Sequence, residues 1–207
     1  VAEVDPPYGI DLGDQKQGGI DSSYREIPID EYGDFLTQAA TAVYRALAPN
    51  AYCIWWYGQQ HHQLVLQTLR ACGFTVDNVP GVWIKAQGQN NQPNKWFSKA
   101  YETFFLAIKG RPSMNKQGRI NVFEYKGVAP QSKIHDTERP VELIRDILKH
   151  TTTPHSGSVL CPFLGSGNTI IAASDQGLGC IGWDIAGEDT RNQFMARVLS
   201  LTGGDIS

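Results

Sequence analysis

The residues best suited to do chemistry stand near the start of the chain, where a short apolar run leads into Asp5-Pro6-Pro7-Tyr8. Proline fixes φ and has no N–H group, so two successive prolines give a stiff loop that offers almost only hydrogen-bond acceptors. These acceptors are the Asp5 carboxylate and the backbone carbonyls of Asp5 and Pro6. A rigid acceptor pair beside the Tyr8 ring suits a planar group that carries an –NH₂. An ordinary proline-rich exit from a strand would have the same residues, because Asp-Pro and Pro-Pro are turn signals.

A second stretch that could hold a ligand is 159–169, where the pattern predicts a strand, a glycine turn and the start of a helix. Glycine lets the backbone approach a ligand closely, and a helix N-terminus presents free N–H groups. Asp184 ends the next predicted strand, 19 residues after Gly165, where dinucleotide-type folds place an acid that binds ribose hydroxyls. The stretch favours a nucleoside-containing ligand, although tight packing of the helix on the strand would also require glycine.

The elements that must position these residues alternate between helices and strands. Helical spacing of apolar residues predicts helices from about residue 30, over 59–71, from Pro140, over 168–176 and over 191–201. Apolar runs predict strands at 51–57, 74–76, 82–85, 103–108, 120–125, 158–163 and 179–185. Residues 9–29 and the amide-rich segment 87–94 are predicted to be loops. The alternation predicts an α/β fold, a mostly parallel sheet with helices on both faces.

Length and composition indicate one globular domain. The 207 residues are 41% apolar and 19% charged, and such a chain can bury a substantial core. No stretch reaches the roughly 18 consecutive apolar residues of a membrane-spanning helix. The cysteines show no C-x-x-C spacing, which favours reduced thiols in a cytoplasmic protein over disulfides. The histidines form no recognisable ligand set, so no metal site is predicted.

Charge is unevenly distributed along the chain, whose net charge is −3. Residues 85–135 carry nine Lys and Arg against two Asp and Glu, whereas the segments before and after are acidic. A basic block between two acidic ones is a candidate surface for phosphate groups. A solvated, lysine-rich loop would have the same composition.

Three motifs in one order carry a resemblance to a known family. Asp5-Pro6-Pro7-Tyr8 is followed by His-Asp-Thr-Glu-Arg-Pro-Val-Glu-Leu over 135–143 and by Cys-Pro-Phe-Leu-Gly-Ser-Gly over 161–167. This set resembles the amino-directed DNA methyltransferases that use S-adenosylmethionine, and the order is similar to that of their β group. The resemblance covers residues 4–185. It implies a Rossmann-like methyltransferase fold with a circularly permuted motif order, in which the catalytic motif precedes the cofactor's glycine turn.

The activity implied by this resemblance is transfer of a methyl group to the N6 amine of adenine in double-stranded DNA, after the base flips out of the helix. Asp5 and the Pro6 carbonyl would accept the two N–H groups of the amine, Pro7 would belong to the same loop and Tyr8 would stack on the base. Cytosine N4 methylation needs the same acceptors and is the alternative. A catalytically impaired DNA-binding relative is a further alternative. A nicotinamide-type oxidoreductase would leave the first motif unexplained.

The cofactor site implied by the resemblance combines the later two motifs with Asp184, which matches the acid on the ribose. Thr137 and Arg139 match residues near the cofactor's methionine end. The other matched residues belong to the glycine turn and its flanks: Cys161, Pro162, Phe163, Gly165, Ser166, Gly167, Asn168 and Thr169. The family has proline at 136, lysine at 139, an acid at 161 and threonine at 168. Because an acid at position 161 would favour a cationic ligand, its loss calls cofactor affinity into question.

DNA recognition is expected from the basic block, interpreted as a target-recognition-like insertion at about 85–135 within a single methyltransferase domain over 1–207. The candidates for DNA contacts are its basic residues and the aromatic pair after the amide-rich loop: Lys85, Lys95, Trp96, Phe97, Lys99, Arg111, Lys116, Arg119, Lys126 and Lys133. Core packing is the alternative for the aromatic pair. The family normally has a strand ahead of its first motif, so an N-terminal truncation is expected. A homodimer, an additional N-terminal domain and a cognate nuclease, as in restriction-modification, stay open.

Overall fold

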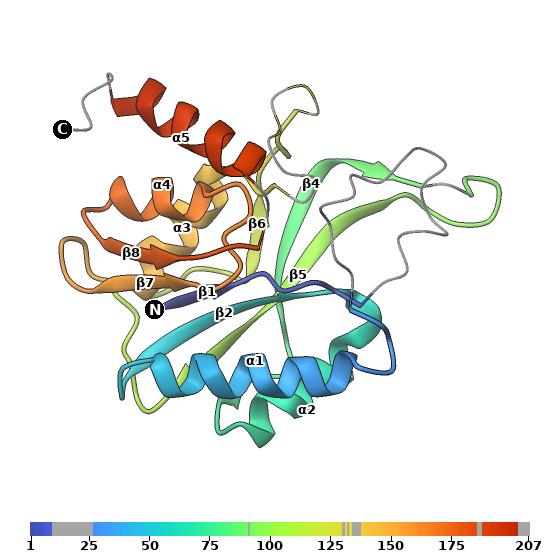
Figure 1. Ribbon diagram of the computed structural model, residues 1–207. Helices are drawn as coiled ribbons and strands as arrows, with labels where there is room; N and C mark the ends of the chain where they lie inside the picture. The colour runs from blue at the N-terminus through green and yellow to red at the C-terminus, as the bar shows by residue number, and fades with distance from the viewer. Residues whose placement is uncertain are drawn as a thin grey trace.

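The computed structural model describes residues 1–9, 27–90, 92–129, 131, 133, 138–185 and 188–202. These residues form one mixed sheet with the strand order β6-β4-β5-β2-β1-β7-β8, and β3 pairs with β5 (Figure 1). The strands are β1 (Ala2–Val4), β2 (Ala51–Tyr57), β3 (Thr75–Val76), β4 (Gly81–Gln89), β5 (Lys99–Lys109), β6 (Val122–Glu124), β7 (Ser158–Cys161) and β8 (Gly179–Gly182). The helices are α1 (Tyr32–Ala46), α2 (His62–Ala71), α3 (Val141–Thr151), α4 (Asn168–Ser174) and α5 (Glu188–Thr202), with a 3-10 turn η1 (Gln59–His61) before α2.

The strand that ends at the Asp5 loop lies in the middle of the sheet. β1 pairs in parallel with β2 on one side and with β7 on the other, and β7 continues in parallel to β8. All three residues of β1 and all seven of β2 are buried, because helices cover both faces of these strands. The carboxyl ends of the four strands therefore meet at one edge, and that edge is where open α/β sheets bind ligands.

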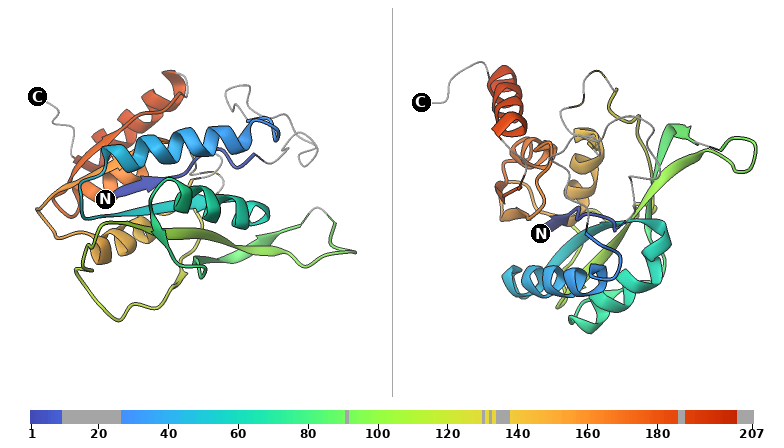
Figure 2. Two further views of the ribbon diagram at one scale, coloured as in Figure 1. Left: turned by 90° about the horizontal axis from the view of Figure 1, so that it is seen from below. Right: turned by 45° about the vertical axis from the view of Figure 1, so that its right-hand side comes forward.

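Helices cover the two faces of the sheet, as Figures 1 and 2 show. On one face, α1 and α2 contribute Leu36 and Leu69 to a core that includes Val4. On the other face, α3 contributes Leu143 and Ile147 to a second core with Trp56. The two-faced arrangement confirms the predicted α/β class. In the described part of the chain, no helix has the length and apolar character that crossing a membrane requires.

β4 and β5 form a long antiparallel hairpin that projects beyond the rest of the sheet (Figure 2). β2 ends at Tyr57, which pairs with Thr103, so Lys99–Glu102 of β5 extends past the carboxyl edge of the parallel strands. The amide-rich segment was expected to be a loop throughout, but β4 continues to Gln89. Polar residues suit this strand because a projecting two-stranded ribbon has no core to face.

Candidate active site

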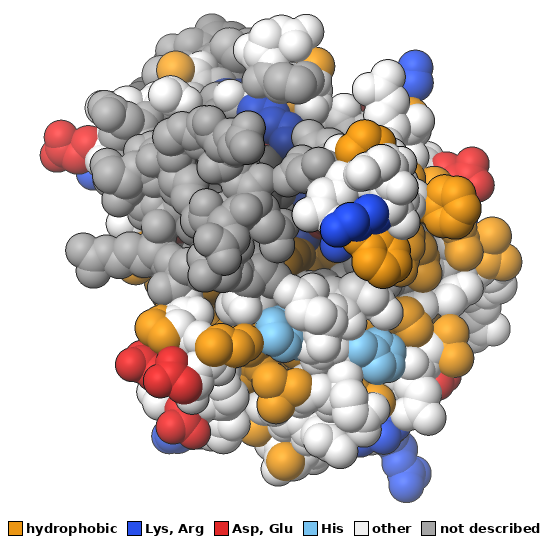
Figure 3. Space-filling model, turned by 90° about the vertical axis from the view of Figure 1, so that its right-hand side faces the viewer, with side chains coloured by type: hydrophobic (Ala, Val, Ile, Leu, Met, Phe, Trp, Pro, Cys, Tyr) orange, Lys and Arg blue, Asp and Glu red, His pale blue; other side chains and the backbone are white. Residues whose placement is uncertain are grey.

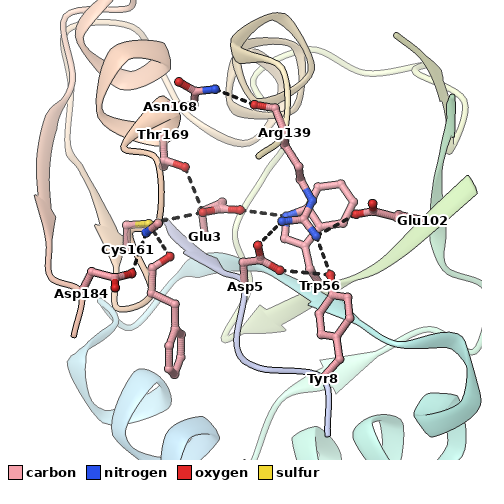
Figure 4. Close-up of polar contacts among 12 residues, drawn as sticks. Glu3, Asp5, Tyr8, Trp56, Glu102, Arg139, Cys161, Asn168, Thr169 and Asp184 are labelled. Atoms are coloured by element: carbon pink, nitrogen blue, oxygen red, sulfur yellow. Dashed lines mark hydrogen bonds and ion pairs between the residues drawn. The ribbon is translucent and has the colours of Figure 1, made fainter. Parts of the chain in front are cut away.

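The Asp5 loop leaves β1 at the carboxyl edge, and its carboxylate accepts two hydrogen bonds from nearby side chains (Figure 4). The Tyr8 hydroxyl donates to Oδ1 at 3.0 Å, and the Arg139 guanidinium donates to Oδ2 and forms an ion pair. Burial raises the pKa of Tyr8 well above its ordinary value, and the opposing charge of Arg139 does not overcome that effect. Tyr8 is therefore a neutral phenol whose hydroxyl donates a hydrogen bond to Asp5 across the loop.

Arg139 joins Asp5, Tyr8 and Glu102 into one cluster. Its side chain is only 5% exposed. It donates to the Tyr8 hydroxyl and, at 2.9 Å, to Oε2 of Glu102, while Cζ lies 4.0 Å from the centre of the Trp56 ring. Burial opposes the charge, but Asp5 and the other acidic groups outweigh burial and hold the pKa of Arg139 well above its ordinary value. Its Nε–H is buried without a hydrogen-bond partner among the described residues.

Glu102 completes the cluster from the hairpin. Its carboxylate forms ion pairs with Arg139 and with Lys85. Burial alone would raise the pKa of Glu102, but the two cations lower it below its ordinary value. The hairpin is thus tied to the Asp5 loop through one arginine.

Glu3 is a site residue that the sequence reasoning missed. It is 3% exposed, and its carboxylate accepts hydrogen bonds from Trp56 Nε1 at 2.8 Å, Cys161 Sγ at 3.4 Å and Thr169 Oγ1 at 3.0 Å. Burial, together with the charge of Asp5, raises the pKa of Glu3. The available signal was a single acid within the otherwise apolar run Val1–Val4, at a position that a central strand buries.

The glycine turn and Asp184 lie together at the ends of β7 and β8. The Gly165 N–H donates to Oδ2 of Asp184 at 2.7 Å, and Gly165 and Gly167 have φ values of 52° and 76°, which favour glycine. Gly167 makes room for protein and not for a ligand, since a Cβ there would lie 2.2 Å from the Phe194 ring of α5. The turn itself is thus fixed by Asp184 on one side and by α5 on the other.

Three of the predicted cofactor residues lie beneath the turn and not on its surface. Cys161 and Thr169 are buried and point at Glu3. The Asn168 amide donates to Oε1 of Glu138 and to the backbone carbonyl of Arg139. These side chains hold β7, α4 and the start of α3 together, so their described contacts are internal.

The remaining predicted cofactor residues have mixed placements. Pro162 is partly buried, Ser166 is buried, and Phe163 packs edge-on against Phe35 of α1, with ring centroids 6.0 Å apart. Thr137 lies outside the described residues.

Comparison with known proteins decides the family. A family model described as DNA methylase matches residues 1–192. The chain belongs to the DNA methylase family. YubD of Escherichia coli (strain K12), described as a methylase, is 27% identical over 182 residues, which are 88% of this chain and 74% of YubD. The resemblance to amino-directed DNA methyltransferases is thereby confirmed.

Solved structures agree with the fold of this methylase. The complex of M1.HpyAVI with SAM has a TM-score of 0.72 and 18% identity, covering 95% of this chain and 87% of that one. The cytosine-N4-specific PvuII DNA methyltransferase has a TM-score of 0.71 and 14% identity, and the match covers 99% of this chain and 86% of that one. TTHA0409 of Thermus thermophilus, complexed with S-adenosyl-L-methionine, has a TM-score of 0.63 and 18% identity, covering 99% and 86%. At these identities the likeness concerns the fold, which is the predicted methyltransferase type.

The predicted DNA-binding residues of the methylase do not form one surface. Lys95, Trp96, Phe97 and Lys99 lie near the exposed tip of the β4–β5 hairpin, on the same side as Asp5. Arg111 follows Lys109, which pairs with the first residue of β2 at the opposite end of the sheet. The separation follows from the length of β5, which carries the chain across the whole sheet.

Several of the other basic candidates serve internal contacts. Lys116 is exposed beside the C-terminal end of α3, where its backbone carbonyl contacts His150. Arg119 forms an ion pair with Asp146 at 3.0 Å, and Lys85 pairs with Glu102. Lys126 and Lys133 are exposed. Figure 3 shows the hairpin side of the molecule, where Lys and Arg atoms lie against hydrophobic side chains.

Within the described ranges, no group of His, Cys, Asp or Glu side chains is arranged to hold a metal ion.

Proposed function

We propose that this methylase transfers a methyl group from S-adenosylmethionine to the exocyclic amine of a DNA base, with the N6 amine of adenine as its target. The observation that carries the proposal is the juxtaposition of two strand ends. The Asp5 loop follows β1, the glycine turn follows β7, and β1 and β7 are parallel neighbours. An acceptor for an amine and a turn suited to a nucleoside thus open at one edge of the sheet.

The residues present fit this cofactor. S-adenosylmethionine supplies a methyl group on a positively charged sulfur, an adenosine and a carboxylate. Asp184 beside the glycine turn suits ribose hydroxyls, and Phe163 offers an apolar flank. The buried Nε–H of Arg139, which lacks a described partner, suits an acceptor such as the methionine carboxylate. Cys161, Asn168 and Thr169 support this site from below.

The chemistry needs the amine nitrogen to regain its lone pair, which is delocalised into the ring of adenine or cytosine. A carboxylate has about four lone-pair positions, and Tyr8 and Arg139 occupy two on Asp5. Asp5 can therefore still accept one amine N–H while the Pro6 carbonyl accepts the other. As the nitrogen–carbon bond forms, the carbon–sulfur bond breaks, and the surplus amine proton passes to Asp5 or to solvent. Arg139 contributes by fixing the carboxylate before the base arrives.

DNA would approach from the side of the hairpin. A stacked base cannot reach Asp5, so the target must flip out, and the tethered Tyr8 ring offers a face for it. At the hairpin tip, Trp96 is 69% and Phe97 is 97% exposed, so neither packs in the core. Together with Lys95 and Lys99 they give a surface for stacking and phosphate contacts.

The direct experiment incubates the purified chain with DNA and S-adenosylmethionine and measures methylated nucleosides by mass spectrometry. N6-methyladenine is the expected product, and N4-methylcytosine would show the alternative base specificity. Asp5→Ala should abolish the product while S-adenosylmethionine still binds, whereas Asp34→Ala, on the exposed side of α1, should retain it. A wild-type chain that binds DNA and forms neither nucleoside would instead be a catalytically impaired relative and would refute the proposal.

A further inference from the structure

Glu3 is a buried carboxylate whose described partners are all neutral. Its hydrogen bonds come from three elements, Trp56 on β2, Cys161 on β7 and Thr169 on α4 (Figure 4). Glu138, another buried acid, forms an ion pair with Arg197, but no ion pair to Glu3 forms within the described part of the chain. A buried carboxylate without a direct cationic partner carries a large desolvation cost. A Gln or an apolar residue would fill the same place at lower cost.

Burial raises the pKa of Glu3, but three donors converge on its carboxylate and favour the anionic form. An ionised carboxylate only accepts hydrogen bonds, and the groups that reach Glu3 are an indole N–H, a thiol and a hydroxyl. Burial and the adjacent Glu3 raise the pKa of the Cys161 thiol well above its ordinary value, so the thiol keeps its proton and donates. Trp56 Nε1 can only donate.

The charges around the Asp5 loop leave Glu3 uncompensated. Arg139 and Lys85 carry two positive charges, and Asp5 and Glu102 carry two negative charges that pair with them directly. These four groups balance one another. Glu3 therefore contributes the net negative charge at the carboxyl ends of β1 and β7, and charge in a buried site acts strongly because little water screens it.

We propose that Glu3 makes the cofactor pocket select the positively charged sulfur of the methyl donor over the neutral sulfur of the demethylated product. This inference rests on the proposed function. Glu3 is an electrostatic positioning residue, since it acts through the layer formed by Cys161 and Thr169. After transfer the sulfur has lost its positive charge, so the attraction to Glu3 is lost at that step and product release becomes easier.

Cys161 offers a way to move the charge without removing it. Its Sγ lies 3.4 Å from Oε2 of Glu3, so a carboxylate at position 161 would occupy almost the same place from the neighbouring strand. Glu3→Gln removes the charge, and Glu3→Gln/Cys161→Asp restores it. Glu3→Gln/Cys161→Asn is the matched control, because it differs from the second variant only in charge.

The test is isothermal titration calorimetry of the full chain with S-adenosylmethionine and S-adenosylhomocysteine. The wild-type chain should bind S-adenosylmethionine more tightly than S-adenosylhomocysteine. Glu3→Gln should weaken the binding of S-adenosylmethionine at least tenfold and change the affinity for S-adenosylhomocysteine less than threefold. The Asp variant should recover the preference and the Asn variant should not. Glu124→Gln, an exposed acid on β6, should change neither affinity.

The outcomes separate this inference from the function on which it rests. A wild-type chain that binds neither compound overturns the proposed function. A wild-type chain that binds both, with a preference unchanged in Glu3→Gln, overturns the role of Glu3 alone. If Glu3→Gln fails to fold, the comparison of the Asp and Asn double variants decides, and equal preferences in that pair refute the charge selection.

Discussion

Replacing Arg139 by methionine tests whether the buried ion pairs of Arg139 with Asp5 and Glu102 stabilise the fold. The change removes a cation that contacts Asp5 and Glu102 directly. Removing one partner of a buried ion pair costs about 3–5 kcal/mol, because the remaining charge is left uncompensated. The side chains of Asp5 and Glu102 are 18% and 25% exposed, so water stabilises part of the charge that is left.

We therefore expect Arg139→Met to lower the free energy of unfolding by about 3 kcal/mol, near the lower end of that range. For a domain of this size the melting temperature should fall by about 6–12 °C, which differential scanning calorimetry measures directly. Arg139→Met/Asp5→Asn should recover part of the loss, since the double variant leaves one fewer unpaired charge.

Arg145→Met is the matched control. Arg145 pairs with Asp175, and both side chains are 40% exposed, so its loss should cost at most about 1 kcal/mol. Equal destabilisation by the two arginine variants, or a loss below about 1 kcal/mol for Arg139→Met, would refute the stabilising role of the buried ion pairs, since that is the range of an exposed pair.

Three further predictions concern other parts of the molecule. Because burial raises the pKa of Glu3 in the folded state, the wild-type chain loses stability as pH rises above the ordinary pKa of a glutamate and through the raised one. Glu3→Gln should therefore gain stability relative to the wild type as pH rises through that range in calorimetric scans, and a gain toward low pH would contradict the sign. Gly167→Ala should destabilise the chain by about 1–3 kcal/mol because its Cβ would meet Phe194, and urea titration should show partial recovery with Gly167→Ala/Phe194→Ala. Phe97→Ala should weaken DNA binding in a fluorescence anisotropy assay and leave the melting temperature unchanged. Lys95→Ala should reduce the slope of log affinity against log salt concentration by about 1. Unchanged DNA binding in both variants would show that the hairpin tip does not contact DNA.

The fold was largely predictable because local patterns and tertiary demands coincide in its elements. The continuous apolar run 51–57 is a strand because helices cover it on both sides, and the stripe that includes Leu143 and Ile147 faces the core as its spacing predicts. Boundaries shifted where pairing partners, which spacing does not encode, extend a strand, as for β4 and β5.

The hydrogen bonds and ion pairs between the side chains of the site were not predictable from sequence. The Asp5 partner Arg139 is 134 positions away, and no local pattern shows that their side chains meet. Glu3 was overlooked because a single acid in a short run carries no periodicity. Its contact with Cys161 also depends on the pairing of β1 with β7, which the sequence does not show. The basic block suggested one surface by composition alone, whereas β5 carries Arg111 to the opposite end of the sheet.

The central position of β1 has a consequence for the order of folding. Ala2 pairs with Leu160, and the Val1 amino group donates to the Ser158 carbonyl. Pairings between residues so distant in sequence form late, since the entropy of closing the chain must be met first. The Asp5 loop precedes these partners in synthesis, yet it gains its neighbour on β7 only after residues 158–161 have been made. A growing chain therefore carries the Asp5 loop without its β7 neighbour until most of the sequence has been made.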